Sequence, residues 1–595
     1  MLLQRMADGF EELEAVTSRR RMVELVASLL SGAAMDEREP LVFLLLGQLR
    51  PPYEGVEIGT GEKLLTTAIA AAYDTTAAAV TRAFKQRGDL GLVAEALSPV
   101  RRNARLSVRH AYDALLEVAG ESGSGSQARR IARLAALLGR VGPREAKYLV
   151  RAAQGRLRIG VGDQTILEAA AVAACGGRDA KPMLEHAYNV RSDLGAVVRI
   201  AFEKGIGGLT RIGPQVGVPV RPALAQRLAS AQAIIARLGE VQAEPKYDGF
   251  RLQLHRDGGR VWAFSRRLEN VTGMFPELTA GLLRQLRAKR AILEGEAVVH
   301  NPETGEFLPF QITMTRKRKT RITESSERYP LRLFAFDLLY ADGRDYLDAP
   351  QRERSRRLRA LVRGTSDQPI AVTEVLLTSS ADELETYFDE MIERGLEGVV
   401  AKRPDAPYHA GARGFDWVKL KRAYQSKLRD TVDLVLVGYL RGRGKRASLG
   451  IGSLLAAVYD VRHDRFRTVA KIGSGLTEEG WKDLRARLDE HSVAHKPARV
   501  DSLIVPDVWT EPALVVEVLA DEITRSPSHT CGKTGSEPGY ALRFPRMLGG
   551  IRTDKSAEDA TTEREVLDLY RLQRPARGGK DGVRKRPTRR PAARR

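Results

Sequence analysis

Lys246 and Asp248 are the residues whose types and spacing first indicate chemistry. They stand two positions apart in Lys246-Tyr247-Asp248-Gly249, directly before an alternating, strand-like run. An uncharged lysine amine is a nucleophile that can form a covalent bond to a substrate. Because free lysine has a pKa of about 10.4, we expect burial or neighbouring cations to lower the pKa of Lys246. The tetrapeptide alone is equally compatible with a plain turn that carries a solvated lysine.

Two pairs of charged residues follow at the spacing of a strand face. Glu294 and Glu296 lie two apart among apolar residues, so their carboxylates share one face and could hold a magnesium ion. Lys419 and Lys421 share a face in the same way, and two lysines projecting together can neutralise a phosphate. Each pair alone is equally typical of a solvated strand. Their order behind Lys246 favours one nucleotide-binding site.

Strands must position these side chains. Residues 250–255 alternate between apolar and polar types, and Asp257–Gly259 predicts a hairpin turn before a second strand. Leu331–Leu339 predicts a further strand. There the ring of Phe336 could stack on a purine, whereas we interpret Phe334 as a core residue.

Residues 1–213 are predicted to form an all-α DNA-binding domain, because alanine and leucine recur at helical spacing. Ser18 and Asp163 are helix-start signals within it. Arg156 and Arg158 stand beside glycines just before Asp163, an arrangement that suits contacts with the backbone phosphates of DNA. A solvated turn between two helices is the alternative interpretation.

The remainder is predicted to divide into three parts. Residues 214–424 are expected to form an α+β domain that carries the nucleophile. Residues 425–573 suggest an all-β barrel of the oligonucleotide-binding (OB) type, with strands at 432–440, 453–461 and 468–472. Residues 574–595, rich in arginine, proline and glycine, are predicted to be a disordered basic tail. The tail could add nonspecific DNA affinity or serve only solubility.

Composition limits the classes of function. The chain has 595 residues and is 43% hydrophobic, which is enough for several cores, and its net charge of +21 favours a polyanionic partner. A merely basic protein remains the alternative on charge alone. Cys175 and Cys531 are too few for a disulfide framework or a zinc site. The N-terminus lacks the pattern of a signal peptide, so we expect a cytoplasmic protein, associated with the nucleoid in a prokaryote.

The chain resembles the ATP-dependent DNA ligases of the covalent nucleotidyltransferase superfamily, especially the archaeal and eukaryotic replicative forms. Nearly the whole chain takes part in the resemblance. The motifs that carry it are EPKYDGFR from Glu244, FSRRLENVT from Phe264, LEGEAV from Leu293, LFAFDLLY from Leu333, EGVVAK from Glu397, WVKLKR from Trp417, GSLLAAVYD from Gly452, VVEVLADEITRSPSH from Val515, and LRFPRMLGGIRTDKSAEDATT from Leu542.

The resemblance implies a role for each matching residue. Lys246 would be the catalytic residue that forms a phosphoramidate with AMP. The residues implied in ATP binding are Glu244, Arg251, Arg266, Glu296, Phe336, Arg413, Lys419 and Lys421. The residues implied in orienting pyrophosphate are Arg543, Arg546, Asp554 and Lys555. Metal ligands would be Glu296 and Glu397, and DNA contacts would come from Arg156 and Arg158.

The resemblance also implies substrates and partners. ATP would donate AMP, Mg²⁺ or Mn²⁺ would assist, and nicked double-stranded DNA would be sealed in replication, recombination and repair. A monomer that contacts a sliding clamp is expected. ATP rather than NAD is expected, because NAD-dependent relatives carry a four-cysteine zinc site that two cysteines cannot build.

Three other functions were weighed. An mRNA-capping guanylyltransferase or an RNA ligase would share the lysine chemistry but would not need the large helical N-terminal region. A nonenzymatic DNA-binding scaffold would explain the charge and the helices, but not the ordered nucleotide motifs.

Overall fold

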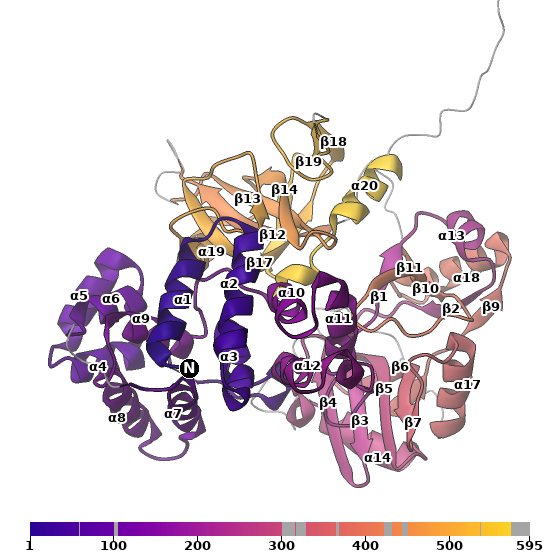
Figure 1. Ribbon diagram of the computed structural model, residues 1–595. Helices are drawn as coiled ribbons and strands as arrows, with labels where there is room; N and C mark the ends of the chain where they lie inside the picture. Colours follow the sequence, from indigo (N-terminus) through magenta and orange to yellow (C-terminus); the bar gives the residue numbers. More distant parts are fainter. Residues whose placement is uncertain are drawn as a thin grey trace, which may run out of the picture.

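The computed structural model describes residues 1–58, 60–99, 105–299, 316, 326, 329–364, 368–421, 431–442, 450–535 and 537–572. These form a helical N-terminal region, a central region with two β-sheets and a β-rich C-terminal region (Figure 1). The boundary predicted between residues 424 and 425 and the tail predicted for residues 574–595 lie outside the described residues.

The N-terminal region is helical, as predicted. Its elements are α1 (Leu3–Ala15), α2 (Arg19–Gly32), η1 (Met35–Glu37), α3 (Arg38–Leu45), η2 (Pro52–Glu54), α4 (Glu62–Ala72), α5 (Ala77–Arg87), α6 (Leu90–Leu97), α7 (Val108–Gly120), α8 (Ser126–Leu138), α9 (Pro143–Ala153), α10 (Asp163–Ala174), η3 (Arg178–Ala180), α11 (Lys181–Val190) and α12 (Leu194–Leu209). Helices α2 and α10 begin at the predicted start signals, directly after Ser18 and at Asp163.

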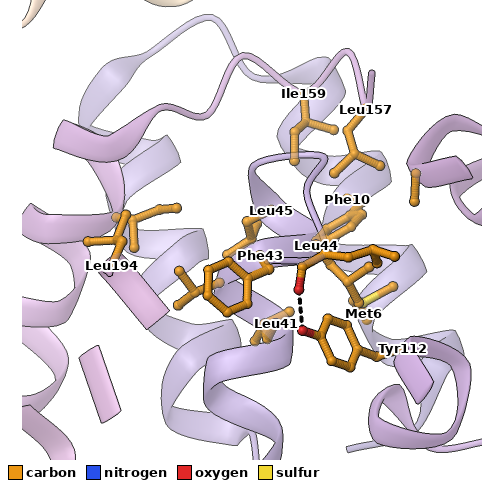
Figure 2. Packing of buried hydrophobic residues seen from close by; sticks show 14 of the residues in the cluster. Met6, Phe10, Leu41, Phe43, Leu44, Leu45, Tyr112, Leu157, Ile159 and Leu194 are labelled. Atoms are coloured by element: carbon orange, nitrogen blue, oxygen red, sulfur yellow. Dashed lines mark hydrogen bonds between the residues drawn. The ribbon is translucent and has the colours of Figure 1, made fainter. Parts of the chain in front are cut away.

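These helices pack through apolar stripes. In α2 the side chains of Met22, Val26 and Leu30 recur every fourth residue and are all buried, which is the spacing of one helix face. In the same core the hydroxyl of Tyr112 donates to the backbone carbonyl of Leu49 (Figure 2). The buried polar tip of Tyr112 is therefore satisfied rather than stranded.

The central region contains two sheets with helices against them. Its elements are β1 (Leu224–Arg227), α13 (Ala231–Leu238), β2 (Val241–Pro245), β3 (Phe250–Asp257), β4 (Arg260–Ser265), η4 (Thr272–Met274), α14 (Pro276–Gln285), β5 (Arg290–Val299), β6 (Leu331–Ala341), β7 (Arg344–Asp345), α17 (Gln351–Leu361), β8 (Ile370–Val372), β9 (Leu376–Thr378), α18 (Ala381–Glu393), β10 (Gly398–Lys402) and β11 (Arg413–Lys421). The strand orders are β1-β11-β10-β2-β9 and β4-β3-β5-β6-β7, with β8 paired to β6.

The predicted hairpin is present as β3 and β4, which pair in antiparallel register. Gly258 in its turn has a φ of +58°, a conformation that glycine adopts without steric cost. The predicted core residue Phe334 is buried and stacks on Tyr247, with ring centroids 4.3 Å apart. These local features follow from alternation and turn chemistry.

The linker between the helical and central regions is fastened by buried side chains of β3. The backbone N–H of Gly217 donates to Nδ1 of His255 at 3.0 Å. The Gln253 amide bonds Val220 in both directions, accepting from its N–H at 2.8 Å and donating to its carbonyl at 3.1 Å. One hydrophobic cluster also continues from the helices through Val220 into the central region. The two regions therefore share a core.

The C-terminal region is β-rich, as predicted. Its elements are β12 (Val432–Leu440), β13 (Ser453–Asp460), β14 (Arg465–Ile472), α19 (Glu478–Glu490), β15 (Ser492–Val493), β16 (Val500–Asp501), β17 (Val508–Leu519), β18 (Glu522–Ser526), β19 (Gly539–Arg543), β20 (Arg546–Ile551), η6 (Ala557–Asp559) and α20 (Glu563–Leu572). Strands β15-β17-β12-β13-β14-β16 form a half-barrel sheet, and β20 pairs with β17. The strands predicted at 432–440, 453–461 and 468–472 correspond to β12, β13 and β14.

Among the described residues, no helix is both long and apolar enough to cross a lipid bilayer.

Candidate active site

A cavity of about 650 Å³ lies between the central and C-terminal regions and has Lys246 in its wall. Strands of both central sheets contribute to it, together with the segment that follows β20. The sequence-predicted residues that line it are Glu244, Lys246, Arg251, Arg266, Glu296, Phe336, Glu397, Arg413, Lys419, Lys421, Asp554 and Lys555.

The backbone of Lys246 is held from both sides. Its N–H donates to the carbonyl of Gly398 at 2.9 Å, and its carbonyl accepts from the N–H of Glu397 at 3.1 Å. The ammonium group of Lys246 then forms an ion pair and hydrogen bond with the Glu397 carboxylate. Strands β2 and β10 thus fix both the position of the amine and its partner.

The charge on Lys246 differs from the sequence-based expectation. Burial lowers its pKa, but the attraction of Glu397 outweighs burial and leaves the pKa raised above the usual lysine value. The expectation of a pKa lowered by cations is wrong for this arrangement, because the group in direct contact is a carboxylate. The amine therefore rests as a cation.

The neighbouring charges respond to one another. Burial raises the pKa of Glu397, but Lys246 and Lys421 overcome that effect and bring it down to about 2. Lys421 donates to this carboxylate at 3.3 Å. Burial lowers the pKa of Lys419 to about 7. Val418 and Leu420 are buried behind the two lysines, as the alternation predicted.

Glu296 is the carboxylate whose charge is least compensated. Burial raises its pKa to about 7, and Lys246 and Arg251 only partly oppose that effect. Glu294, on the same strand face, is instead bonded: it accepts from Arg251 at 2.8 Å and from the hydroxyl of Tyr408 at 2.6 Å. The described part of the chain contains no cluster of three or more histidine, cysteine, aspartate or glutamate side chains placed to hold a metal ion.

An aromatic and apolar wall lies on the side of Glu244. Lys402 pairs with the Glu244 carboxylate at 2.8 Å and sits over the rings of Phe336 and Trp417, 4.8 and 4.3 Å from their centroids. Burial raises the pKa of Glu244 to about 7. Its Oε1 is buried and has no hydrogen-bond partner among the described residues. A buried acceptor of this kind suits a donor on a ligand.

Arg251 connects this wall to the linker. Its guanidinium donates to the carbonyl of Ala223 at 2.6 Å and to Glu294, and its Cζ lies 5.4 Å from the centroid of the Phe336 ring. The sequence did not assign Glu294 a role, although its spacing to Glu296 indicated a shared face. The structure places it as the carboxylate that orients Arg251.

The C-terminal region closes the cavity with residues that follow β20. Arg552 lines the cavity and is paired with Asp554 at 2.7 Å, and Lys555 is paired with Asp433. Arg267 of the central region donates to the carbonyl of Thr553 at 2.5 Å. Sequence reasoning missed Arg552, although its place two residues before Asp554 is a signal that would have found it.

Arg543 and Arg546 are not part of the cavity, in contrast to the sequence-based assignment. Both side chains are exposed at the turn between β19 and β20, and Arg546 pairs with Asp521 at 3.4 Å. The turn projects away because β20 must run on to pair with β17 before the chain reaches the cavity at Arg552.

Two further acidic residues of the C-terminal region reach cations at the cavity. Glu565 of α20 forms an ion pair with Arg413, and Asp559 of η6 lies 3.8 Å from Arg266. Both contacts bridge the central and C-terminal regions, so local sequence patterns could not predict them.

Arg156 and Arg158 lie outside the cavity, in the loop between α9 and α10. Their side chains contact α19 and β15 of the C-terminal region.

A lysine held among carboxylates, cations and a purine-sized aromatic wall defines a nucleotide-binding site with a nucleophile in it. Family models match three successive parts of the chain. They are the DNA ligase N terminus at residues 2–171, the ATP dependent DNA ligase domain at 222–421 and the ATP dependent DNA ligase C terminal region at 447–555.

Individual proteins agree with the family models. A probable DNA ligase of Dictyoglomus thermophilum is 47% identical over 575 residues, which are 96% of this chain and 98% of that protein. A DNA ligase of Aeropyrum pernix is 44% identical over 589 residues, covering 95% of this chain and 97% of the relative. A solved mycobacterial DNA ligase D complexed with ATP and MES is 26% identical, with a TM-score of 0.32, and covers 57% of this chain and 97% of that chain.

The chain therefore belongs to the ATP-dependent DNA ligases. It is an enzyme of this family, whose standard mechanism seals nicks in DNA through a lysine-AMP intermediate. The capping, RNA ligase and scaffold alternatives are set aside by these matches.

Proposed function

We propose that Lys246 is the residue of this ligase that carries AMP. Its amine attacks the α-phosphorus of ATP, forms a P–N bond and expels pyrophosphate. The adenylyl group then passes to the 5′-phosphate of a nick, and the 3′-hydroxyl attacks that phosphate and releases AMP. Support comes from one observation above all: Lys246 is fixed between β2 and β10 in the wall of a cavity that both regions line.

The polar groups around Lys246 support a role for each side of the nucleotide. The orphan Oε1 of Glu244 suits the amino group of adenine, and the ring of Phe336 suits its face. Cations that would neutralise the sugar–phosphate part during transfer are Arg251, Arg266, Arg413, Lys419 and Lys421.

The role of orienting the departing pyrophosphate is proposed for the group that closes the cavity: Arg552, Asp554 and Lys555. Arg543 and Arg546, which were first expected in this role, stand exposed beside Phe544, whose side chain is 73% exposed. We propose that this turn instead contacts the DNA backbone, since exposed arginines suit phosphates.

The carboxylates of the cavity fit a magnesium ion in the form usual for nucleotide enzymes. Mg²⁺ is held by one or two carboxylates, with water and substrate phosphates completing its shell. The partly compensated Glu296 supplies one such oxygen donor, and Glu397 is the second proposed ligand. When bound, the cation would neutralise phosphate charge and weaken the hold of Glu397 on the Lys246 proton.

The half-barrel sheet and its short strands support an OB-type domain in the C-terminal region. We propose domains at 1–213, 214–424 and 425–573, with nicked duplex DNA bound in part by Arg156 and Arg158. Action as a monomer, contact with a sliding clamp and a cytoplasmic location stay predictions.

The direct test replaces the nucleophile. Lys246→Ala and Lys246→Arg should form no acid-labile AMP adduct with labelled ATP and should not seal a phosphorylated nick, because neither side chain can form the phosphoramidate. Mass spectrometry of the wild-type adduct should locate AMP on Lys246. Sealing by a folded Lys246→Ala enzyme at the wild-type rate would refute the proposal.

A further inference from the structure

The loop at residues 156–162 has a fixed, two-sided arrangement. Leu157 and Ile159 are buried in the helical core, where Figure 2 shows them above Phe10 and Leu44. Arg156 and Arg158 alternate with these anchors, and their guanidinium groups bond the C-terminal region instead. The apolar anchors thus set where the two cations project.

The C-terminal region occupies both cations. Arg156 pairs with the Glu490 carboxylate at 2.9 Å, at the end of α19. Arg158 donates to the backbone carbonyls of Glu490 at 3.0 Å and Ser492 at 3.2 Å. Helix C-termini present unpaired carbonyls and negative partial charge, so this end of α19 offers the loop the same kind of acceptors as a phosphate backbone.

A buried contact reinforces this docking. Asp464, whose side chain is 2% exposed, accepts from Arg499 at 2.6 Å and from Arg19 of helix α2 at 3.1 Å. The guanidinium of Arg499 also covers the backbone at Gly162, where an added Cβ would lie 2.6 Å from its Nη1. Removing a partner from such a buried charge cluster is costly, so the docking is more than a surface ion pair.

The same position of the C-terminal region closes the nucleotide cavity. Arg267 bonds the carbonyl of Thr553, and Arg552 and Lys555 line the cavity with Lys246. Docking of α19 on the helical region and closure over Lys246 are therefore features of one arrangement. A ligand that favours either contact favours both.

We propose that the C-terminal region and nicked DNA compete for the loop at residues 156–162. The closed arrangement that serves adenylation of Lys246 then covers these two DNA-contacting arginines, and DNA bound there opposes closure. By linkage, DNA antagonises adduct formation while closure weakens DNA binding. The inference rests on the proposed contact of Arg156 and Arg158 with DNA.

The test removes one charge from the docking contact in the full-length enzyme. Glu490→Gln should tighten binding of a nicked duplex that lacks the 5′-phosphate by about threefold to fivefold, since an exposed ion pair contributes little more than that. The matched control is Asp483→Asn, which removes the same charge from α19 where the partner is Arg487 of the same helix. The control should change affinity less than about twofold.

Two further measurements complete the test. The same duplex should slow formation of the Lys246 adduct, and more so in Glu490→Gln. In an Arg156→Ala background, Glu490→Gln should no longer change affinity. Equal affinities of Glu490→Gln and Asp483→Asn, or an adduct rate that DNA leaves unchanged, would overturn the competition. Wild-type affinity in Arg156→Ala would instead refute the proposed DNA contact itself, so the two failures are distinguishable.

Discussion

At the scale of single residues, the ion pair between Lys246 and Glu397 determines the state of the nucleophile. The two residues lie 151 positions apart in sequence and meet where β2 and β10 pair. The carboxylate aligns the amine but also holds its proton, because it raises the Lys246 pKa. Attack therefore requires that the hold of Glu397 be relaxed after the nucleotide enters.

Arg552 provides the first prediction at this scale. Arg552→Ala should slow formation of the Lys246 adduct by about 100-fold, the size of effect seen when one preorganised donor is removed from developing phosphate charge. Sealing of a nick that already carries AMP should fall much less, because pyrophosphate has no part in that step. Single-turnover assays of the two steps measure the difference.

The control for Arg552 is Arg543→Ala, an exposed arginine of the same region. It should leave adduct formation within about threefold of wild type, since its side chain does not line the cavity. Equal losses in adduct formation for the two variants would show that the cavity has been assigned the wrong arginine.

Glu296 provides a prediction about pH. Its pKa is raised from 4.5 to about 7, so the folded nucleotide-free enzyme binds this proton more tightly than the unfolded chain does. The resulting stability is fully present below about pH 4.5 and is lost as pH rises through about 7. Relative to wild type, Glu296→Gln should therefore gain about 1 to 3 kcal/mol in unfolding free energy between about pH 5 and about pH 8.

Urea unfolding of both proteins at the two pH values measures this change. Glu479→Gln, at an exposed position of α19, is the matched control and should show no such trend. A constant difference between Glu296→Gln and wild type across the range would mean that the folded protein does not hold the Glu296 proton.

At the scale of elements, Gly398 lets β10 approach β11. Its φ is +139°, and an added Cβ would collide with the backbone carbonyl of Leu420. Gly398→Ala should therefore destabilise the enzyme by more than about 2 kcal/mol and impair adduct formation, since the Gly398 carbonyl also accepts from the N–H of Lys246. Thermal unfolding and labelled ATP measure the two effects.

Gly395 supplies the comparison for Gly398. Its φ of +80° also favours glycine, but an added Cβ would meet open space. Gly395→Ala should cost only about 1 to 2 kcal/mol, the cost of a left-handed side-chain residue. Similar losses in the two variants would indicate that backbone conformation, rather than the approach of β11, limits residue 398.

Sequence patterns predicted the elements that depend on near neighbours. Alternation placed Lys419 and Lys421 on one face over Val418 and Leu420, and turn chemistry placed the hairpin after β3. These predictions hold because strand period and turn geometry act over a few residues.

Features that depend on distant contacts could not be predicted in this way. His255 and Gln253 are polar yet buried, because the linker covers their face of β3. Arg552 reaches the cavity only because the C-terminal region folds over it, and the Lys246 pKa has the opposite sign from the expectation because Glu397 arrives from another strand. Family resemblance found most site residues, but closure itself is a property of the assembled regions.

At the scale of the whole molecule, the net charge of +21 suits a polyanionic substrate, and residues 574–595 concentrate arginine at the C-terminus. Deleting residues 574–595 should reduce the slope of log affinity for nicked DNA against log salt concentration, because fewer counterions are released on binding. Anisotropy titrations over a series of salt concentrations measure the slope. An unchanged slope would leave these residues only a solubilising role.

The fastened linker has a consequence for dissection of the enzyme. A shortened chain that starts after Ala223 would lose the backbone groups that satisfy Gln253 and Arg251. Those polar side chains would then face water or go without partners beneath the sheet. An isolated adenylating fragment should therefore begin no later than Gln215, and a protease that cuts between Gly217 and Ala223 should inactivate the enzyme without touching its nucleophile.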